Sequence, residues 1–485
     1  MELSDLTIKK LHQGLVDKEF SAGEVTQAYF NKIKANDHEI GAYLSLAHDT
    51  AKKEAQAVDD AIANNETIPM LAGAPLAVKD CILVKDLPAT SASKMLEHYR
   101  ASYDATAIQK LKSASAVFLG KTNLDEFAMG SSTENSGFKI TKNPHDLTRV
   151  PGGSSGGSTA AVAGGMALAA LGSDTFGSIR LPASYCGVVG FKPTYGAVSR
   201  SGLIAMTSSM DQIGPITKTV EDAAILFKAI AGKDPLDATS ADTNYDNVLP
   251  EDLSPLKKLT IGLPEEYFID GIDPAVSKEM DRVIEKLTSL GLKFKKVSLP
   301  HTKYAVPCYY LSMPAEVSSN LARFDGIRYA PLAEAITKNE TLTERYFKQR
   351  GAGFGAEVKR RIILGTYVLS SGYYDAYYEK AQRARTLIKQ DFENVFKDVD
   401  VLFTPVAPTP AFKIGEKIDD PVAMYLSDVF TGPTNLAGLP GISIPSKPLS
   451  ALAPKELPIG FQLIGKWWRE ADILGIGQLY ENLEQ

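Results

Sequence analysis

Apolar and polar residues follow one another in patterns that predict short strands and amphipathic helices along the whole chain. The apolar repeat predicts helices at residues 25–33, 221–231 and 275–290 and a mostly helical stretch over 316–390. Short apolar runs predict strands within residues 71–80, 116–123, 259–264, 294–297, 399–405, 441–445 and 459–465, with a helix after the last one. This intermixing predicts an α/β fold, a single large domain with a mixed β-sheet core surrounded by helices. Residues 1–65 show helical patterns, so we expect residues 1–70 to pack as a helical segment on an α/β domain of residues 71–485.

Composition and charge place the chain among ordinary globular proteins. The chain has 485 residues, 44% of them apolar and 23% charged, with a net charge of −6. This charge gives no overall basic footprint for nucleic acid, although a partner subunit could still handle one. Three cysteines without CxxC spacing (Cys81, Cys186 and Cys308) predict reduced thiols and no metal site. The chain shows no signal peptide and no apolar run of the roughly 18–20 residues that span a bilayer, so we expect a soluble cytoplasmic protein without membrane contact.

Two glycine- and serine-rich clusters, residues 150–158 and 172–180, are the strongest indication of a functional site. Glycine leaves backbone N–H groups free to face a ligand, and a serine beside such donors is a nucleophile beside an oxyanion hole. A flexible linker has a similar composition. Residues 160–171 between the clusters are largely apolar, which linkers are not. We therefore interpret the clusters as a site.

A catalytic serine needs a base, and the sequence offers two kinds. His145, within residues 143–146, is the histidine nearest to the clusters and could serve in a Ser-His-Asp triad. Lys79 follows the apolar run 75–78, so its amine would enter at the end of a buried strand. Burial can lower a lysine pKa enough for the neutral amine to accept a proton. Composition alone would leave Lys79 as an exposed residue at a strand end.

Two short motif matches do not indicate further functions, and a third motif is absent. Residues 152–156 match the G-x-S-x-G elbow of α/β-hydrolases, but a proline and a polar stretch precede them where the elbow requires a strand. Residues 91–94 match S-x-x-K without the companion motifs of β-lactamases. The phosphate-binding pattern G-x-x-x-x-G-K-[ST] does not occur, so nucleotide hydrolysis lacks its cradle.

Taken together, these residues resemble the amidase signature family of hydrolases over nearly the whole chain. The resemblance implies the amidase signature fold and a catalytic triad of Lys79, Ser154 and Ser178. Ser178 would be the nucleophile, and Ser154, in a cis peptide bond, would relay its proton to neutral Lys79. Backbone N–H groups would form the oxyanion hole, from Thr175, Phe176, Gly177 and Ser178.

Within this family the chain resembles the A subunits of glutamyl-tRNA(Gln)/aspartyl-tRNA(Asn) amidotransferases, which hydrolyse glutamine and pass ammonia to a partner. The resembling stretches are residues 121–136, 210–215, 314–323, 359–367, 370–378 and 435–441. The resemblance implies B and C partner subunits in a heterotrimer and contact with tRNA only through the B subunit. It implies no cofactor or metal in this chain, with ATP and Mg²⁺ belonging to a partner. Substrate-binding residues would be Met129, Gly130, Ser131, Tyr309, Tyr310, Arg361 and Asp428. Arg361 would bind the α-carboxylate of glutamine and Asp428 its α-amine.

Two residues depart from the family pattern. Phe176 stands where most members have glycine, so its ring would crowd the acyl pocket or reshape it toward apolar substrates, and a required positive φ would strain it. Leu181 stands where the A subunits often have glutamine. A stand-alone amidase, aryl acylamidase or carbamate (urethane) hydrolase is therefore the alternative. A catalytically silent scaffold is the third hypothesis, which an intact triad disfavours.

Overall fold

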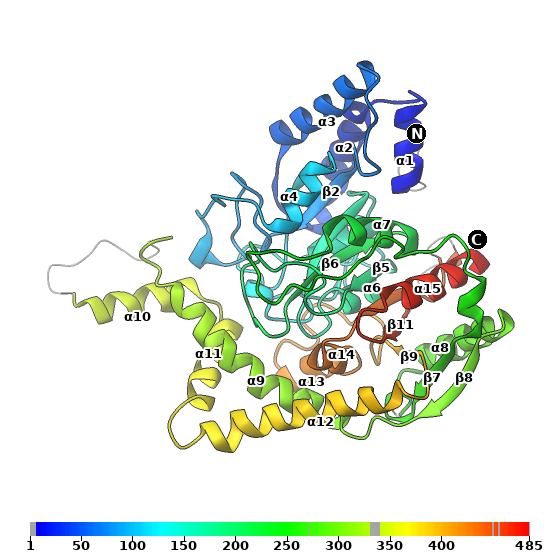
Figure 1. Cartoon of the computed structure of the whole chain (residues 1–485). Helices are drawn as coiled ribbons and strands as arrows, with labels where there is room; N and C mark the ends of the chain where they lie inside the picture. The colour runs from blue at the N-terminus through cyan, green and yellow to red at the C-terminus, as the bar shows by residue number, and fades with distance from the viewer. Residues whose placement is uncertain (1–5, 270, 330–339, 449–450, 454–455, 485) are drawn as a thin grey trace.

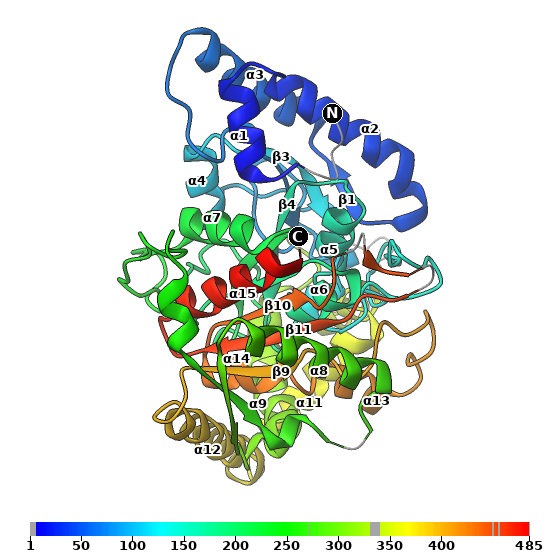
Figure 2. The same cartoon turned by 90° about the vertical axis from the view of Figure 1, so that its right-hand side faces the viewer.

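A mixed sheet of eleven strands runs through the computed structural model, which describes residues 6–269, 271–329, 340–448, 451–453 and 456–484 (Figures 1 and 2). Strand β2 pairs in parallel with β3 and β4, and β7 pairs in parallel with β8 and β9, whereas the other neighbours are antiparallel. The predicted mixed sheet is therefore confirmed. In spatial order the strands are β1 (Tyr43–Leu46), β3 (Val117–Thr122), β2 (Pro75–Lys79), β4 (Ala169–Asp174), β6 (Gln212–Thr217), β5 (Val189–Lys192), β10 (Gly441–Pro445), β11 (Gly460–Gly465), β9 (Val401–Pro405), β7 (Thr260–Pro264) and β8 (Lys293–Val297).

Helices surround this sheet, as the intermixed sequence pattern predicts (Figure 1). Helix α9 packs on both α11 and α12, and α10 extends away from the body of the molecule (Figure 1). No described helix combines the length and the apolar character needed to cross a bilayer. The helices are α1 (Ile8–Val16), α2 (Ala22–Ile40), α3 (His48–Ala63), α4 (Thr106–Ser113), α5 (Gly156–Ala163), α6 (Arg180–Cys186), α7 (Val220–Ile230), α8 (Pro274–Ser289), α9 (Ala305–Asn320), α10 (Leu342–Gly353), α11 (Ala356–Val368), α12 (Lys380–Val395), α13 (Pro421–Tyr425), α14 (Gly432–Ala437) and α15 (Glu470–Glu484).

The N-terminal segment is not purely helical. Helices α1, α2 and α3 lie together at one end of the sheet (Figure 1), but β1 between α2 and α3 joins the sheet as an antiparallel neighbour of β3. A four-residue edge strand is too short to show a period of two clearly, which is why the sequence analysis missed it. The proposed division at residue 70 stays a prediction.

The sheet brings the two halves of the candidate site together. Strands β2 and β4 are parallel neighbours, with Val78 opposite Leu171, so their carboxyl ends lie side by side. Lys79 ends β2, and the loop after β4 leads to Ser178. Helix α5 starts at Gly156, directly after Ser154 and Ser155. Glycine at position 157 allows this helix to approach β3 closely, because a Cβ there would lie 2.4 Å from the carbonyl oxygen of Asn123.

Candidate active site

Lys79 is fully buried at the end of β2, with hydroxyl groups around its amine. Its Nζ lies 2.7 Å from Oγ of Ser154, 2.8 Å from Oγ of Ser155 and 3.0 Å from Oγ of Ser173. Burial lowers the pKa of Lys79, while the acidic groups of Cys81, Asp125, Asp174 and Asp211 act to raise it. The amine is thus next to a serine hydroxyl and in surroundings that favour its neutral form.

Ser154 is held in place by the backbone on both sides. The Gly153–Ser154 peptide bond is cis, as the family resemblance implies. The carbonyl oxygen of Ser154 accepts a hydrogen bond of 3.4 Å from the N–H of Asp125. The next residue, Ser155, donates its N–H to the carbonyl oxygen of Ser178 at 3.0 Å. The two glycine- and serine-rich clusters therefore contact each other directly.

A buried ion pair fixes the loop that carries Ser178. Asp174 and Arg180, at the two ends of the loop, have fully buried side chains 3.1 Å apart. Asp174 also accepts the N–H groups of Gly177 at 2.9 Å and Ile179 at 3.1 Å. Burial alone would raise the pKa of Asp174, but Arg180 and the other donors lower it to about 2, so the carboxylate stays charged. Ser178 itself is 8% exposed.

The oxyanion donors predicted from the sequence need one correction. The N–H of Gly177 is occupied by Asp174 and is not available to a substrate oxygen. Within the described part of the chain, the N–H groups of Phe176 and Ser178 have no hydrogen-bond partner. The same holds for the N–H of Thr175, so Thr175, Phe176 and Ser178 carry the candidate donors, and each such donor stabilises an oxyanion by roughly 3 kcal/mol.

Phe176 adopts its position without the strain that a positive φ would impose. It is not among the described residues with positive φ; its neighbour Gly177 takes φ 134° instead. The Phe176 ring is buried, stacks on Tyr309 and covers Gly432, where a Cβ would lie 2.0 Å from the ring. The condition for backbone strain, a positive φ at Phe176, is therefore not met. Leu181, the other departure from the family pattern, is buried in a separate apolar cluster with Val150 and Met424.

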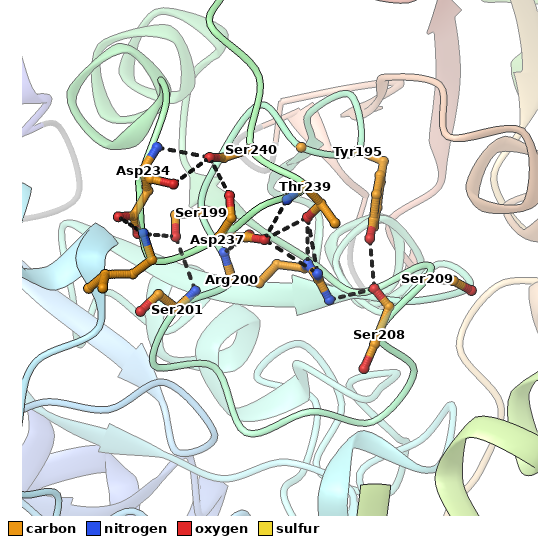
Figure 3. A network of polar contacts seen from close by, with 12 residues as sticks. Tyr195, Ser199, Arg200, Ser201, Ser208, Ser209, Asp234, Asp237, Thr239 and Ser240 are labelled. Carbon is orange, nitrogen blue, oxygen red and sulfur yellow. Dashed lines mark hydrogen bonds and ion pairs between the residues drawn. The ribbon is translucent and has the colours of Figure 1, made fainter. Parts of the chain in front are cut away.

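Thr175 connects the nucleophile loop to a braced loop between β5 and β6. Its hydroxyl donates to Oδ1 of Asp211 at 2.7 Å, and Oδ2 of Asp211 accepts the N–H groups of Met206 and Thr207, each at 2.9 Å. Burial raises the pKa of Asp211 to about 6. Figure 3 shows how Arg200 anchors this loop. The backbone N–H of Arg200 donates to Asp237 at 2.8 Å, and the guanidinium of Arg200 donates to the hydroxyl of Thr239 and to the carbonyl oxygen of Ser208.

Asp428 lies in a short 3-10 turn, Leu426–Asp428, beside the nucleophile loop. The hydroxyl of Ser131 donates to its Oδ2, whereas its Oδ1 is buried and has no hydrogen-bond partner among the described residues. Burial, with the nearby charges of Asp174 and Asp125, raises the pKa of Asp428 to about 8. Thr431, three residues later, donates to the carbonyl oxygen of Phe176 at 2.8 Å. A buried carboxyl oxygen without a donor, such as Oδ1 of Asp428, can accept a hydrogen bond from a substrate cation.

Arg361, on α11, is 3% exposed and contacts aromatic rings. Its guanidinium lies 5.4 Å from the ring of Tyr310 and 5.7 Å from that of Tyr425, and these two rings stack at 3.8 Å. Tyr309 links this group to Phe176, since its ring contacts both Tyr310 and Phe176. The predicted pocket residues Tyr309, Tyr310 and Arg361 thus form one cluster that reaches the residue two positions before Ser178.

The remaining predicted residues frame this cluster. Met129 is buried, and its carbonyl oxygen accepts a hydrogen bond from Asn135 at 3.3 Å. Gly130 has no room for a side chain, because a Cβ would lie 2.4 Å from Asp125. Asp125 in turn accepts the N–H groups of Thr133 and Asn135. The loop that presents Ser131 to Asp428 is therefore fixed by a buried carboxyl group.

The alternative base does not contact the serines. His145 places Nε2 2.9 Å from the carbonyl oxygen of Cys186, and Asp146 accepts hydrogen bonds from Thr148 and Arg149. No strand lies directly before Ser154, in agreement with the rejection of the hydrolase elbow. Among the described residues no three His, Cys, Asp or Glu side chains are grouped to hold a metal ion.

Sequence reasoning missed the residues that support the site. These are Ser155, Ser173, Asp174, Arg180 and Asp211, which contact Lys79 or fix the nucleophile loop. Asp174 and Arg180 left a signal, since two opposite charges flank a short loop inside a stretch of small and apolar residues. Asp211 left no local signal of its contact with the loop, because its partner Thr175 is 36 residues away.

Comparisons with known proteins show the family of this chain. A family model described as "Amidase" matches residues 24–474. Two curated relatives, both named as the A subunit of glutamyl-tRNA(Gln) amidotransferase, are 56% identical (Carboxydothermus hydrogenoformans; 99% of this chain, 98% of the relative) and 52% identical (Koribacter versatilis; 99% of both). The solved structure of the Thermotoga maritima protein of that name is 42% identical, with a TM-score of 0.79 over 98% of this chain and 94% of that chain. The chain thus belongs to the amidase family.

Proposed function

We propose that this chain is the glutaminase subunit of a tRNA-dependent amidotransferase. The family membership supports amide hydrolysis, and the names of the full-length relatives support this particular role. The observation that carries the glutamine assignment is a buried arginine and a buried carboxyl group, Arg361 and Asp428, near one nucleophile loop. Free glutamine offers a carboxylate and an ammonium group to match them.

The chemistry follows from the contacts of Lys79. Ser178 Oγ would attack the carbonyl carbon of the glutamine side-chain amide, and its proton would pass through Ser154 to the neutral amine of Lys79. The N–H groups of Thr175, Phe176 and Ser178 would stabilise the oxyanion. Lys79 would then return the proton to the departing nitrogen, which releases ammonia and leaves an acyl ester on Ser178. Water hydrolyses this ester by the same proton route and gives glutamate.

Partner subunits would use the ammonia. In a heterotrimer with B and C subunits, we assign tRNA to the B subunit and ATP and Mg²⁺ to a partner subunit, because no phosphate-binding motif is present in this sequence and the net charge is −6. The relatives' printed name, a subunit of an amidotransferase, supports the presence of partners.

The test measures ammonia release from three substrates, with and without the partner subunits. Glutamine carries both α groups, 4-aminobutanamide lacks only the carboxylate, and glutaramate lacks only the amine. We expect glutamine to be the best substrate, and Ser178→Ala to abolish turnover of all three. Arg361→Ala should raise KM for glutamine strongly and spare 4-aminobutanamide. Equal losses on both substrates would contradict the carboxylate role.

A stand-alone amidase is the second candidate, and Phe176 is the observation that favours it. Its buried ring adds apolar surface next to the expected oxyanion donors. Release of an aniline from an acyl-anilide or of an alcohol from a carbamate, faster than release of ammonia from glutamine in the presence of partners, would select this candidate.

A further inference from the structure

Glu357 lies behind Arg361 and occupies one edge of its guanidinium. The two residues are four positions apart on α11, and Oε1 of Glu357 accepts the Nε–H of Arg361 at 2.7 Å. Both side chains are buried, with 4% of Arg361 and 9% of Glu357 exposed. The Nη1 group of Arg361 contacts a weak acceptor, Sδ of Met313 at 3.7 Å. The hydroxyl of Tyr309 also hydrogen-bonds the guanidinium, so among the described residues a carboxylate contacts Arg361 only on its Nε side.

The carboxylate of Glu357 is itself held from two directions. Its Oε1 also accepts the phenolic hydroxyl of Tyr425 at 3.0 Å, and its Oε2 pairs with Arg360. Tyr425 stacks on Tyr310, so the aromatic rings beside Arg361 and the carboxylate behind it form one packed unit. Neither Glu357 nor Arg361 can turn without breaking these contacts.

This arrangement decides which face of Arg361 a ligand can use. A carboxylate binds a guanidinium in two-point fashion either through Nε and one Nη or through both Nη groups. Glu357 occupies the Nε edge, which leaves the Nη1–Nη2 edge for a second carboxylate. A guanidinium fixed in advance also loses less rotamer entropy when the ligand binds.

We propose that Glu357 is a positioning residue that orients Arg361 so that its Nη edge receives the substrate's α-carboxylate. This inference rests on the proposed glutaminase function. It goes further because it assigns part of the affinity for the α-carboxylate to Glu357, a buried residue that acts through Arg361 without touching the substrate. A purely structural salt bridge would stabilise α11 without distinguishing one substrate from another.

The experiment compares Glu357→Gln with Lys359→Gln, a control on the same helix whose side chain is exposed and bonds the carbonyl oxygen of Gly351. KM and kcat are measured for glutamine and 4-aminobutanamide in the complex with partner subunits. We expect Glu357→Gln to raise KM for glutamine about tenfold, with kcat and the kinetics of 4-aminobutanamide changed less than about twofold. The control should match the wild type. Tyr425→Phe, which removes one donor to Glu357, should change the glutamine KM in the same direction by a smaller factor.

The outcomes separate the two proposals. If Arg361→Ala leaves the glutamine KM unchanged, the proposed carboxylate site itself is wrong. If Arg361→Ala raises that KM but neither Glu357→Gln nor Tyr425→Phe does, only the positioning role is wrong. A parallel loss on both substrates in Glu357→Gln would show a structural role and would likewise overturn the inference. Should Glu357→Gln fail to fold, Tyr425→Phe alone decides by the same criterion.

Discussion

The ring of Phe176 lies face to face with the ring of Tyr309, with centroids 3.9 Å apart and planes inclined by 18°. One residue belongs to the nucleophile loop and the other to α9, so the stack joins the catalytic centre to the helix that lines the candidate pocket. The ring also fills the space over Gly432, whose missing side chain makes room for it. Phe176 is thus accommodated by its surroundings and does not disturb them.

This packing predicts that Phe176→Gly brings no gain in glutamine turnover. Removal of the ring leaves a cavity, and Tyr309 loses the ring on which it stacks. We therefore expect a loss of about 3–5 kcal/mol in the free energy of unfolding. A double-mutant cycle with Tyr309→Leu should give a coupling energy of about 0.5–1.5 kcal/mol. Phe392→Ala, at a buried position on α12, is the control, with a similar loss of stability but no change in KM. Faster glutamine hydrolysis by Phe176→Gly would show that the ring obstructs the pocket.

The burial of Lys79 predicts opposite effects on activity and stability. Lys79→Met should reduce kcat by at least about 10³-fold, since the residue acts as a unit with the two serines. The folded pKa of Lys79 is lowered, so the folded state binds fewer protons than the unfolded state between that pKa and 10.5. Stability from this group therefore rises with pH in this window, and below the window the buried amine is destabilising.

Lys79→Met should consequently raise Tm at neutral pH while it removes activity. Differential scanning calorimetry and ammonia release measure the two effects on the same preparation. Lys85→Met, at an exposed lysine shortly after β2, should change neither quantity. A lower Tm for Lys79→Met would mean that the amine is charged and well paired, which would contradict its role as a base.

The contacts of Asp211 predict a role in positioning Thr175. Its two oxygens accept the Thr175 hydroxyl and two backbone N–H groups, and an asparagine cannot satisfy all three donors. We expect Asp211→Asn and Thr175→Val each to lower kcat about 10- to 100-fold with KM nearly unchanged, because the oxyanion donors next to Thr175 shift. The double variant should lose no more than the worse single one. Thr386→Val, on the exposed face of α12, serves as the control. Additive losses would indicate two unrelated effects.

The elements whose residues carry a clear local pattern could be predicted from the sequence. Helix α8 and strands β7 and β9 were found this way because their apolar periodicity is strong. Strand β4, with the sequence Ala-Ala-Leu-Gly-Ser-Asp, was missed since small residues and glycine have low strand propensity. Its strand state depends on pairing with β2 and β6, which are far away in the sequence.

The candidate site shows the same division. The glycine- and serine-rich clusters could be recognised as part of the site from the sequence, because closely spaced glycines leave backbone N–H groups free to face a ligand. The environment of Lys79 could not be derived locally, since burial and three hydroxyl contacts arise only when β2, β4 and the residues before α5 meet. The pairing of Arg361 with Glu357 follows a helical spacing of four residues, but nothing in that spacing tells which edge of the guanidinium remains open.

The raised pKa of Asp428, about 8, predicts a pH dependence specific to substrates with an α-amine. Below pH 8 the empty site holds a neutral carboxyl group, which must lose its proton to bind an ammonium ion. The ratio of kcat/KM for glutamine to that for glutaramate should therefore rise from about pH 6 to 8, by up to about tenfold per pH unit, and then level off. The ratio cancels the titration of Lys79, because both substrates need the same base.

Asp428→Asn should flatten this ratio and lower it to a value near one. The same substitution has a consequence for stability. The folded state keeps the proton on Asp428 between about pH 4 and 8 while the unfolded state has lost it, so stability from this group falls as pH rises through that window. Asp428→Asn should thus diminish the fall in Tm between pH 6 and about pH 8.5. A ratio that is already flat in the wild type would show that Asp428 is charged in the empty site or does not bind the amine.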